Sequence, residues 1–455
     1  MRSTRNSSLT RRAFSRTLSL GAIGVAAAPD LLLRSRRTLS AGERPDRRIS
    51  PNENIQIAIV GNGGMGELDV GTALSVPGVR IVAACDLFDG RLTAAKEMWG
   101  QEVFTTRDYR EILERSDVDA IICATPDHWH HRISVDALNK GKPVYCEKPM
   151  VHSIGQGKDI VEAEKRSGVT YQVGSQGMSS LGNEKAKELY EAGEIGELNY
   201  AEGFWARNSP TGAWQYEIPQ EASPETVDWD RYLETVENKV PYDPLRFFRW
   251  RNYRDYGTGV AGDLFVHLFS SLHFVVSSIG PTRIAAMGGL RFWRDGREVP
   301  DVMLGMFEYP EAETHPPFNL SLRVNFVDGT SGSTFLRLVG SEGAMDVLWD
   351  EVVVYKNKKS DPTDAFLKAK ADESGLQRER KQMLPPAEAR YVAEDGYLGA
   401  HCDHFANFFD GVRAGKPVAE NSVFGFRAAA PALAANMSYF EDRIVKWNPV
   451  DLTAL

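Results

Sequence analysis

The chain has 455 residues, more than one typical domain, and its 42% hydrophobic and 25% charged residues exclude global disorder. Its formal net charge of -9 argues against nucleic acid as a partner, because phosphate binding needs a basic surface. The four cysteines are too few and too scattered for a disulfide framework or a metal cluster, and three of them end apolar runs, where a buried thiol is expected: Cys85, Cys123, Cys146 and Cys402.

The N-terminal segment has the pattern of an export signal. Thr10-Arg11-Arg12-Ala13-Phe14 resembles a twin-arginine motif, and the small and apolar residues that follow are too few to span a bilayer as a helix. Cleavage after the alanines at 26–28, cleavage nearer Ala41, and retention as an anchor all stay open. We predict a signal peptide over residues 1–41, a periplasmic or secreted protein, and no stable membrane span after processing. The alternative is a disordered basic tail.

Apolar strands alternate with helical stretches between residues 53 and 175. Such alternation is typical of a parallel, doubly wound sheet, and it predicts an α/β nucleotide-binding domain of the Rossmann type. The predicted strands lie at 54–60, 79–86, 118–126 and 143–150, and the predicted helices at 67–76, 91–100 and 131–141.

Strands dominate the pattern after residue 176. This predicts a second, α+β domain over 176–455 with a large antiparallel sheet, and hairpin signals such as Asp328-Gly329 separate some of its strands. The polar stretch 356–395 is expected to form a surface loop with a short helix, and two final helices are expected over 400–415 and 425–440. The expected strands lie at 197–207, 283–293, 302–310, 319–329, 332–349 and 351–357.

The glycine-rich sequence "GNGGMG" follows the first strand of the nucleotide-binding domain and precedes a helix. Its G-x-G-x-x-G spacing allows a tight turn, close approach to a pyrophosphate, and close helix–strand packing. Asp86 ends the next strand, where a carboxylate accepts hydrogen bonds from an adenosine ribose and repels a 2′-phosphate. The combination predicts NAD binding, with NADP less favoured. The predicted contacts are Gly61, Asn62, Gly63, Gly64, Met65, Gly66 and Asp86.

Polar residues also follow the next two strands, in "TPDHWH" and "EKP". Ligands of such sheets bind at the carboxyl ends of the strands, so these residues should face the cofactor crevice. They are Thr125, Pro126, His130, Glu147 and Lys148. A lysine there offers a cation to a substrate oxygen, and the equally weighted alternative is a surface lysine with no such role.

Asp263 and His267 stand four residues apart inside an apolar run. On a helix this spacing places both on one face, where they act together or simply satisfy each other. Spacing alone favours mutual satisfaction.

Taken together, these motifs resemble the glucose–fructose oxidoreductase / inositol dehydrogenase family (Gfo/Idh/MocA). The resemblance rests on the glycine motif, the acidic strand end, "TPDHWH", "EKP" and the later Asp-x-x-x-His, and it spans roughly residues 53–440. It implies a Rossmann domain joined to a domain with a large, mostly antiparallel sheet. It also implies hydride transfer between NAD(P) and a hydroxyl carbon of a sugar, cyclitol or glycoside, and a homo-oligomer, either dimer or tetramer.

By position, Lys148 resembles the family's lysine that contacts nicotinamide and substrate. His267 resembles its general acid/base, and Asp263 the residue that positions substrate or imidazole. This sequence departs from the family in reading "GTGVAG" before the helix and Ser270 after the histidine, and in having an additional His273. The roles of His267 and His273 therefore stay open.

The segment 208–257 is an insertion rich in aromatic residues. Its rings form either a wall for stacking a carbohydrate or ordinary packing, and we weigh the two equally for Trp205, Trp214, Trp229, Tyr242, Trp250 and Tyr253; Arg249 and Arg251 either position substrate or pair with acidic residues. Export with a nicotinamide cofactor predicts that NAD is tightly bound. Two alternatives to a dehydrogenase remain: NAD-assisted glycoside cleavage through a transient 3-keto sugar, and a non-catalytic protein that binds sugar or NAD.

Overall fold

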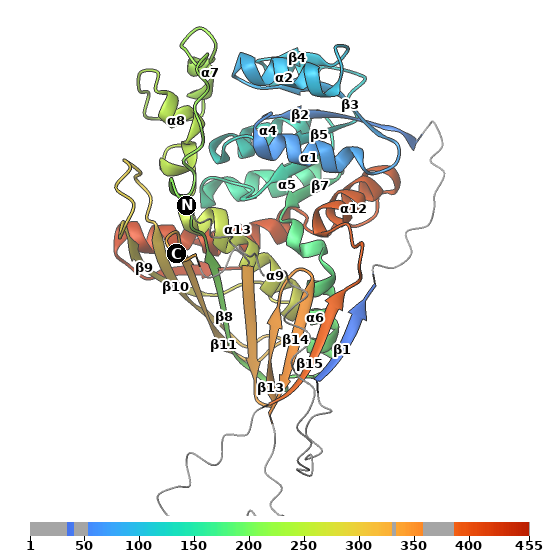
Figure 1. Cartoon of the computed structure of the whole chain (residues 1–455), viewed down its shortest axis with the longest axis vertical. Helices are drawn as coiled ribbons and strands as arrows, with labels where there is room; N and C mark the ends of the chain where they lie inside the picture. Colours follow the sequence, from blue (N-terminus) through green and yellow to red (C-terminus); the bar gives the residue numbers. More distant parts are fainter. Residues whose placement is uncertain (1–33, 41–52, 330–333, 358–385, 455) are drawn as a thin grey trace, which may run out of the picture.

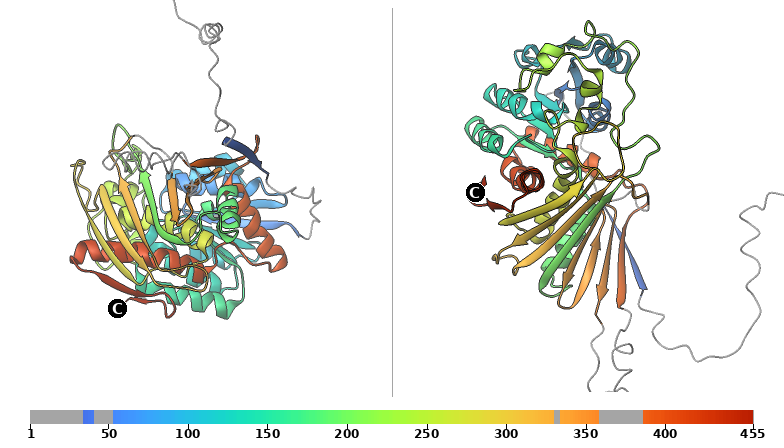
Figure 2. Two further views of the ribbon diagram at one scale, coloured as in Figure 1. Left: turned by 90° about the horizontal axis from the view of Figure 1, so that it is seen from below. Right: turned by 90° about the vertical axis from the view of Figure 1, so that its left-hand side faces the viewer.

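The computed structural model describes residues 34–40, 53–329, 334–357 and 386–454, so the twin-arginine motif lies outside the described residues. Two sheets organise the chain, and the smaller one lies above the larger in Figure 1. The smaller sheet belongs to the nucleotide-binding domain, and the larger one forms the base of the molecule (Figure 2).

The smaller sheet has six parallel strands in the order β4-β3-β2-β5-β6-β7, as the alternating pattern predicts. Its central strands are apolar throughout because helices cover both faces. The strands are β2 (Ile55–Val60), β3 (Val79–Cys85), β4 (Phe104–Thr106), β5 (Ala120–Cys123), β6 (Val144–Glu147) and β7 (Tyr171–Gly174). The helices are α1 (Gly64–Leu74), α2 (Asp89–Trp99), α3 (Tyr109–Leu113), α4 (Asp127–Asn139) and α5 (Gly157–Ser167).

The larger sheet has eleven strands in the order β1-β15-β14-β13-β12-β8-β11-β10-β9-β16-β17. It is mostly antiparallel, as predicted, and among the strands that the structure describes the parallel pairs are β1–β15 and β8–β11. Buried and exposed residues alternate along β10, so one face of the sheet is packed and the other is open. The strands are β1 (Arg34–Leu39), β8 (Leu198–Ala206), β9 (Arg283–Gly289), β10 (Val302–Tyr309), β11 (Phe318–Asn325), β12 (Thr334–Gly340), β13 (Gly343–Val347), β14 (Glu351–Lys356), β15 (Ala387–Ala393), β16 (Val445–Asn448) and β17 (Thr453–Ala454).

Three helices cover the packed face: α6 (Leu181–Glu191), α9 (Val266–Val276) and α13 (Ser422–Glu441). A 3-10 turn, η4 (Gln176–Ser179), leads from the smaller sheet into α6, and a π-helical turn, η6 (Ala261–Phe265), leads into α9. Another 3-10 turn, η3 (Ile154–Gln156), precedes α5. No helix of the described residues is both long and apolar enough to cross a membrane.

Three features differ from the expectations of the sequence. Asp328-Gly329 does not close a hairpin, because β8 lies between β11 and β12 in the sheet. Part of the expected loop 356–395 forms β15, which gains its stability from pairing with β14 on one side and β1 on the other. Strand β1 falls inside the predicted signal peptide, so cleavage near Ala41 would remove an edge strand of the larger sheet.

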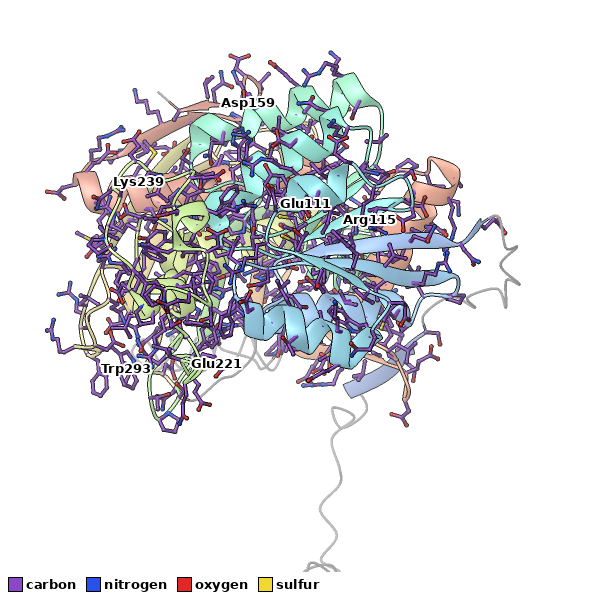
Figure 3. The ribbon with its side chains drawn as sticks, turned by 90° about the horizontal axis from the view of Figure 1, so that it is seen from above. Glu111, Arg115, Asp159, Glu221, Lys239 and Trp293 are labelled. Carbon is purple, nitrogen blue, oxygen red and sulfur yellow. The ribbon has the colours of Figure 1, made fainter. Side chains whose placement is uncertain are left out.

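Residues 208–257 form an arm that rises from the larger sheet and lies along the nucleotide-binding domain (Figure 1). Seen from above in Figure 3, Glu221 and Lys239 of the arm lie to one side of Glu111 and Arg115 of that domain, with Trp293 near the arm and Asp159 on α5. The arm carries only short helices: α7 (Trp229–Tyr232), α8 (Pro244–Phe248) and η5 (Trp250–Asn252).

The arm is attached through backbone and aromatic contacts. Val227 forms a β-bridge with Phe88, and the backbone N–H of Asp228 donates to the carbonyl of Leu87 (2.8 Å). Phe88 packs edge-on against Phe248 at 5.3 Å, within a separate core that the arm shares with the loop after β3. The arm is therefore fixed to the nucleotide-binding domain rather than hanging free.

Helix α12 (Ala400–Ala414) crosses the expected domain boundary. It belongs to the segment assigned from sequence to the second domain, yet Phe405, Phe408 and Phe409 are buried against Ile57 and Tyr145 of the smaller sheet. The rings of Phe405 and Tyr145 stack with centroids 4.2 Å apart. The nucleotide-binding domain is thus completed by a helix from the far end of the chain.

Candidate active site

A cavity of about 590 Å³ lies between the glycine-rich loop, the arm and helix α9. This volume is in the range of cofactor and substrate sites. It is lined by most of the residues that the sequence analysis selected, namely Gly61, Gly63, Gly64, Met65, Asp86, Thr125, Pro126, Glu147, Lys148, Asp263 and His267. Asn62, Gly66 and His130 lie outside its lining.

The glycine-rich loop has the geometry that a dinucleotide requires. Gly61 has φ +93°, and a Cβ there would stand 2.7 Å from the backbone of Ala124 and Thr125. A Cβ at Gly66 would stand 2.1 Å from the carbonyl oxygen of Gly61, so the helix packs too closely for any side chain. The N-terminus of α1 has no side-chain cap, which leaves its free N–H groups for an anion in the cavity. The loop therefore fits a pyrophosphate.

Asp86 is 5% exposed at the end of β3, beside this loop. Its carboxylate accepts hydrogen bonds from the backbone N–H groups of Asn62 (2.8 Å) and Phe88 (3.0 Å). Arg91 lies 3.5 Å from the same carboxylate and equally close to the position of a Cβ at Gly63. Asn62 thus serves the site through its backbone, and Arg91 is a lining residue that the sequence did not single out.

His130 was expected to face the cofactor crevice, but it lies outside the cavity lining. It is 1% exposed, and its ring nitrogens lie 2.9 Å from the carbonyl oxygen of Thr125 and 2.8 Å from that of Pro149. It therefore ties together the two loops that follow β5 and β6. Glu147 lies in the cavity wall, where Gln176 donates to its Oε1 (2.6 Å), and burial raises the pKa of Glu147 above its usual range.

Lys148 reaches across from the nucleotide-binding domain to the second domain. Its Nζ donates to the backbone oxygen of Asp263 (2.9 Å) and to Asp263 Oδ1 (2.8 Å), and the lysine side chain is only 11% exposed. Arg251 of the arm also contacts Asp263 Oδ1, at 3.3 Å. Although burial alone would raise the pKa of Asp263, these two cations hold it below its usual range.

Asp263 and His267 do not form the mutual hydrogen bond that their spacing suggests. Asp263 lies in the π-helical turn η6, whereas His267 lies in the first turn of α9, so the regular four-residue spacing of an α-helix does not hold between them. Such π-helical turns are frequent at functional sites. The carboxylate pairs with Lys148 and Arg251, and both Asp263 and His267 line the cavity.

His267 is held by aromatic rings rather than by hydrogen bonds. Its ring centroid lies 5.1 Å from Trp205 and 6.1 Å from Trp349. Its Nδ1 is buried without a partner among the described residues, which leaves Nε2 as the nitrogen that can meet a ligand. Burial, and then the charge of Lys148, lower the pKa of His267 well below its usual value, so the imidazole is neutral at neutral pH.

The second histidine of the motif region is a core residue. His273 is 1% exposed, does not line the cavity, and its Nε2 lies 2.8 Å from the hydroxyl of Tyr309. Burial lowers its pKa to about 3. Ser270, where the family has an aspartate, donates to Glu420 Oε1 (2.9 Å) in the core. The geometry therefore places His267, and not His273, at the site.

The aromatic residues of the arm region divide between the two expected roles. Trp205, Trp214 and Trp250 line the cavity, whereas Trp229, Tyr242 and Tyr253 pack in the core that the arm shares with the nucleotide-binding domain. The two arginines divide likewise. Arg251 contacts Asp263, whereas Arg249 lies away from the cavity lining and holds Gln215 Oε1 (2.6 Å) and the carbonyl of Tyr216 (2.8 Å).

Further lining residues were not selected from the sequence, among them Arg207, Trp349 and His401. Arg207 directly follows β8, Trp349 lies between β13 and β14, and His401 lies in the first turn of α12. Burial lowers the pKa of His401. No local pattern marks these residues, because only the fold brings their elements to the cavity.

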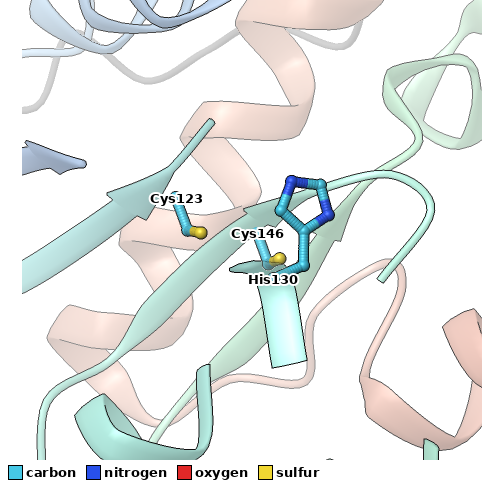
Figure 4. A group of neighbouring side chains, drawn as sticks. All are labelled: Cys123, His130 and Cys146. Atoms are coloured by element: carbon cyan, nitrogen blue, oxygen red, sulfur yellow. The ribbon is translucent and has the colours of Figure 1, made fainter. Parts of the chain in front are cut away.

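Two of the cysteines that looked scattered are neighbours. Cys123 and Cys146 are paired in register on β5 and β6, and with His130 their ligand atoms all lie within 4.8 Å of one another (Figure 4). Both ring nitrogens of His130 already face backbone carbonyls, and Cys146 Sγ donates to the carbonyl of Glu147 (3.4 Å). All four cysteines are free thiols. We therefore interpret the cluster as part of the core, because His130 and Cys146 already form hydrogen bonds with backbone carbonyls.

Comparisons with known proteins agree with this geometry. Residues 55–175 match the oxidoreductase family Gfo/Idh/MocA, described by its NAD-binding Rossmann fold. Inositol 2-dehydrogenase of Rubrobacter xylanophilus is 34% identical over 160 residues, which make up 35% of this chain and 45% of that protein. For scyllo-inositol 2-dehydrogenase (NAD(+)) of Bacillus subtilis the identity is 32% over 151 residues, or 33% of this chain and 44% of that protein. The chain thus spans less than half the length of these relatives.

Solved structures of other proteins resemble most of this chain in fold. A levoglucosan dehydrogenase in complex with NADH and levoglucosan superimposes with a TM-score of 0.63 at 18% identity, covering 86% of this chain and 99% of that one. At this identity the likeness concerns the fold, and it extends over both sheets. Residues 55–175 therefore match the NAD-binding Rossmann fold of the Gfo/Idh/MocA oxidoreductase family.

Proposed function

We propose that this protein is an exported NAD-dependent oxidoreductase that transfers hydride to or from a hydroxyl carbon of a sugar, cyclitol or glycoside. One observation carries the proposal. Lys148 from the first domain and Asp263 and His267 from the second meet in the cavity that begins at the glycine-rich loop. The names of the inositol and levoglucosan dehydrogenases cited above support this substrate class.

The three side chains divide the work of alcohol oxidation. Lys148 has three N–H donors and gives two of them to Asp263, so one remains for the oxygen of the substrate. His267 is neutral, and its Nε2 accepts the hydroxyl proton. Asp263 holds Lys148 in place and balances its charge. Bound NAD supplies the hydride acceptor. In the reverse direction the same groups return the proton to a carbonyl oxygen.

The arm supports a tightly held cofactor. Arg231, Tyr232, Phe247 and Phe248 of the arm line the cavity beside Asp86, at its adenosine end. The arm is bound there by ion pairs from Arg231 to Asp108 (2.9 Å) and from Arg110 to Glu234 (2.7 Å), besides its aromatic core. Release of the nucleotide would require these contacts to open, which favours recycling of the cofactor in place by a second substrate or an electron partner.

Export through the twin-arginine route, with delivery to the periplasm or the outside, completes the proposal. That route carries folded proteins, which accounts for a nicotinamide cofactor outside the cytoplasm. The contacts of strand β1 help to choose between the possible cleavage sites of the signal peptide. In this strand, Arg37 lies over the ring of Tyr391, 5.5 Å from its centroid, and donates a hydrogen bond to its hydroxyl. Cleavage after the alanines at 26–28 keeps this strand, so we favour it over cleavage near Ala41.

A homo-oligomer is proposed from the open face of the larger sheet. Met287 and Leu304 are cross-strand partners on that face and are 78% and 51% exposed, and Met306 beside them is 55% exposed. An apolar strip of this kind is typical of an interface between copies of a chain. Sedimentation of the mature protein separates dimer, tetramer and monomer.

One experiment tests the function. The mature protein is purified, its bound nucleotide is released and identified, and sugars, cyclitols and aryl glycosides are screened for NADH formation and for release of the aglycone. NADH formation with an intact glycoside is expected. Aglycone release without net reduction would instead establish NAD-assisted cleavage. A protein that binds nucleotide but reacts with none of these compounds would be a binding protein, and absence of nucleotide would overturn the proposal.

A further inference from the structure

The following inference rests on the proposed function and narrows its substrate class. Arg207 lies at the rim of the cavity, directly after β8. Its backbone N–H donates to the carbonyl of Asn325 (3.0 Å), and its guanidinium lies over the ring of Trp205, 5.4 Å from the centroid. Among the described residues, no carboxylate lies within ion-pair distance of this guanidinium. The guanidinium thus lies over an aromatic ring at the cavity and has no ion pair with any described residue.

Arg207 differs in this from the other cations at the same end of the cavity. Lys148 and Arg251 converge on the single carboxylate of Asp263. Glu217 also lines the cavity, but it is exposed and forms no ion pair with any described residue. The substrate end therefore carries more positive than negative charge. The imidazole responds to this excess, because Lys148 and Arg207 both lower the pKa of His267.

Arg207 and His267 both lie close to the indole ring of Trp205. The imidazole centroid lies 5.1 Å from the ring of Trp205, and the guanidinium carbon lies 5.4 Å from it. Trp214 and Trp250 line the same cavity and offer further flat apolar surfaces to a pyranose. A ligand in this cavity with its reacting hydroxyl at His267 would therefore bring another substituent within reach of Arg207.

We propose that the substrate is a pyranose bearing a carboxylate, a uronic acid or its glycoside, and that Arg207 binds this carboxylate. The planar fork of a guanidinium matches the two oxygens of a carboxylate. A single uncompensated guanidinium suits a singly charged group better than a phosphate monoester, which carries nearly two charges at neutral pH. A sulfate ester has the same charge as a carboxylate, so it is the competing source of the anion.

The test compares matched substrates with the holoenzyme. NADH formation is measured with methyl glucuronoside, methyl galacturonoside, the neutral methyl esters of both, the parent methyl glucoside and galactoside, and their 6-sulfates. The free uronates are expected to show kcat/KM at least about tenfold above their methyl esters. Equal or faster reaction of the esters and neutral glycosides overturns this inference and leaves the proposed function standing. A preference for the 6-sulfates overturns the carboxylate assignment.

Two variants complete the test. Arg207→Gln should raise KM for the uronate by about tenfold or more with kcat changed little, and should leave KM for the methyl ester unchanged. Arg323→Gln is the matched control, because Arg323 also lies over a ring, that of Phe204, but outside the cavity. Equal KM values for the uronate in both variants overturn the role of Arg207. No reaction with any sugar overturns the proposed function itself, and this inference with it.

Discussion

Lys148 and Asp263 stand 115 residues apart in the chain and form an ion pair of 2.8 Å that joins the two domains at the wall of the cavity. Asp263 has a second counter-ion in Arg251, which contacts the same carboxylate oxygen. The pair therefore links the proposed catalytic lysine to the helix that carries the proposed base.

Asp263→Asn should impair both stability and turnover. Removing one partner of a buried ion pair typically costs about 3–5 kcal/mol, and here it leaves Lys148 and Arg251 facing each other. We expect a lower free energy of unfolding in urea and turnover reduced by about two orders of magnitude. Asp295→Asn, which breaks the ion pair with Arg297 outside the cavity, is the control and should leave turnover unchanged. Wild-type turnover in Asp263→Asn would contradict the assigned role.

Comparing His267→Ala with His273→Ala should distinguish a catalytic role of His267 from a structural role of His273. Loss of the base at the cavity is expected to reduce turnover by about two orders of magnitude or more, with bound NAD retained. His273 is a core residue bonded to Tyr309, so its loss should lower the melting temperature instead. Turnover and thermal melting are measured on both proteins. A larger fall in melting temperature for His267→Ala than for His273→Ala would indicate a structural role for His267.

The pH dependence of kcat/KM should reveal the effect of the nearby cations on the pKa of His267. Its folded-state pKa is lowered, so the imidazole loses its proton at a lower pH than an ordinary histidine and acts as a base from there upward. The acidic limb of kcat/KM is therefore expected below the usual histidine value of about 6.5. Arg207→Gln removes one of the charges that lower this pKa and should move the limb upward. An acidic limb at the ordinary value in both proteins would show that the field is absent.

Asp86→Ser should relax the choice of cofactor. The substitution removes the carboxylate that we expect to bind the ribose and to repel a 2′-phosphate, while Arg91 stays beside the glycine-rich loop. Affinity for NAD is expected to fall and affinity for NADP to rise, measured by titration of nucleotide-free protein. Unchanged preference for NAD would mean that another residue makes the selection.

Glu420 should make stability depend on pH. Burial raises its pKa from 4.5 to about 8. Below pH 4.5 the folded and unfolded states both hold the proton. As the pH rises from there toward 8 the unfolded chain loses it first, so the free energy of unfolding falls, by at most about 1.4 kcal/mol per pH unit. Glu420→Gln should flatten this slope while keeping the acceptor for Ser270. Equal slopes in chemical denaturation at pH 5, 6.5 and 8 would refute the assignment.

The signals that predict the nucleotide site are local in the sequence. Gly61, Gly66 and Asp86 each occupy a position that a strand and a helix dictate within a few residues. The β8–β11 pairing and the strand β15 were not predictable in this way, because both depend on partners far away in the chain. Trp349 and His401 escaped for the same reason, since long-range pairing and packing decide which side chains reach the cavity.

The aromatic insertion shows a further limit of sequence patterns. A count of rings cannot distinguish Trp250, which lines the cavity, from Trp229, which packs against Tyr232 in the arm. The spacing of Asp263 and His267 was equally ambiguous: it suggested mutual satisfaction, whereas a π-helical turn lets the carboxylate meet Lys148. In both cases the deciding partner lies on another element.

Helix α12 is synthesised late but covers part of the core of a domain that is synthesised early. The faces of β2 and β6 are covered by Phe405, Phe408 and Phe409, which leave the ribosome only after some four hundred residues. The stretch 55–175 is therefore synthesised before the rings that cover part of its apolar core, and we expect that part to stay exposed until α12 has been made. Residues 55–175 form a domain by sequence pattern, and we expect their folding to be complete only when α12 packs against them.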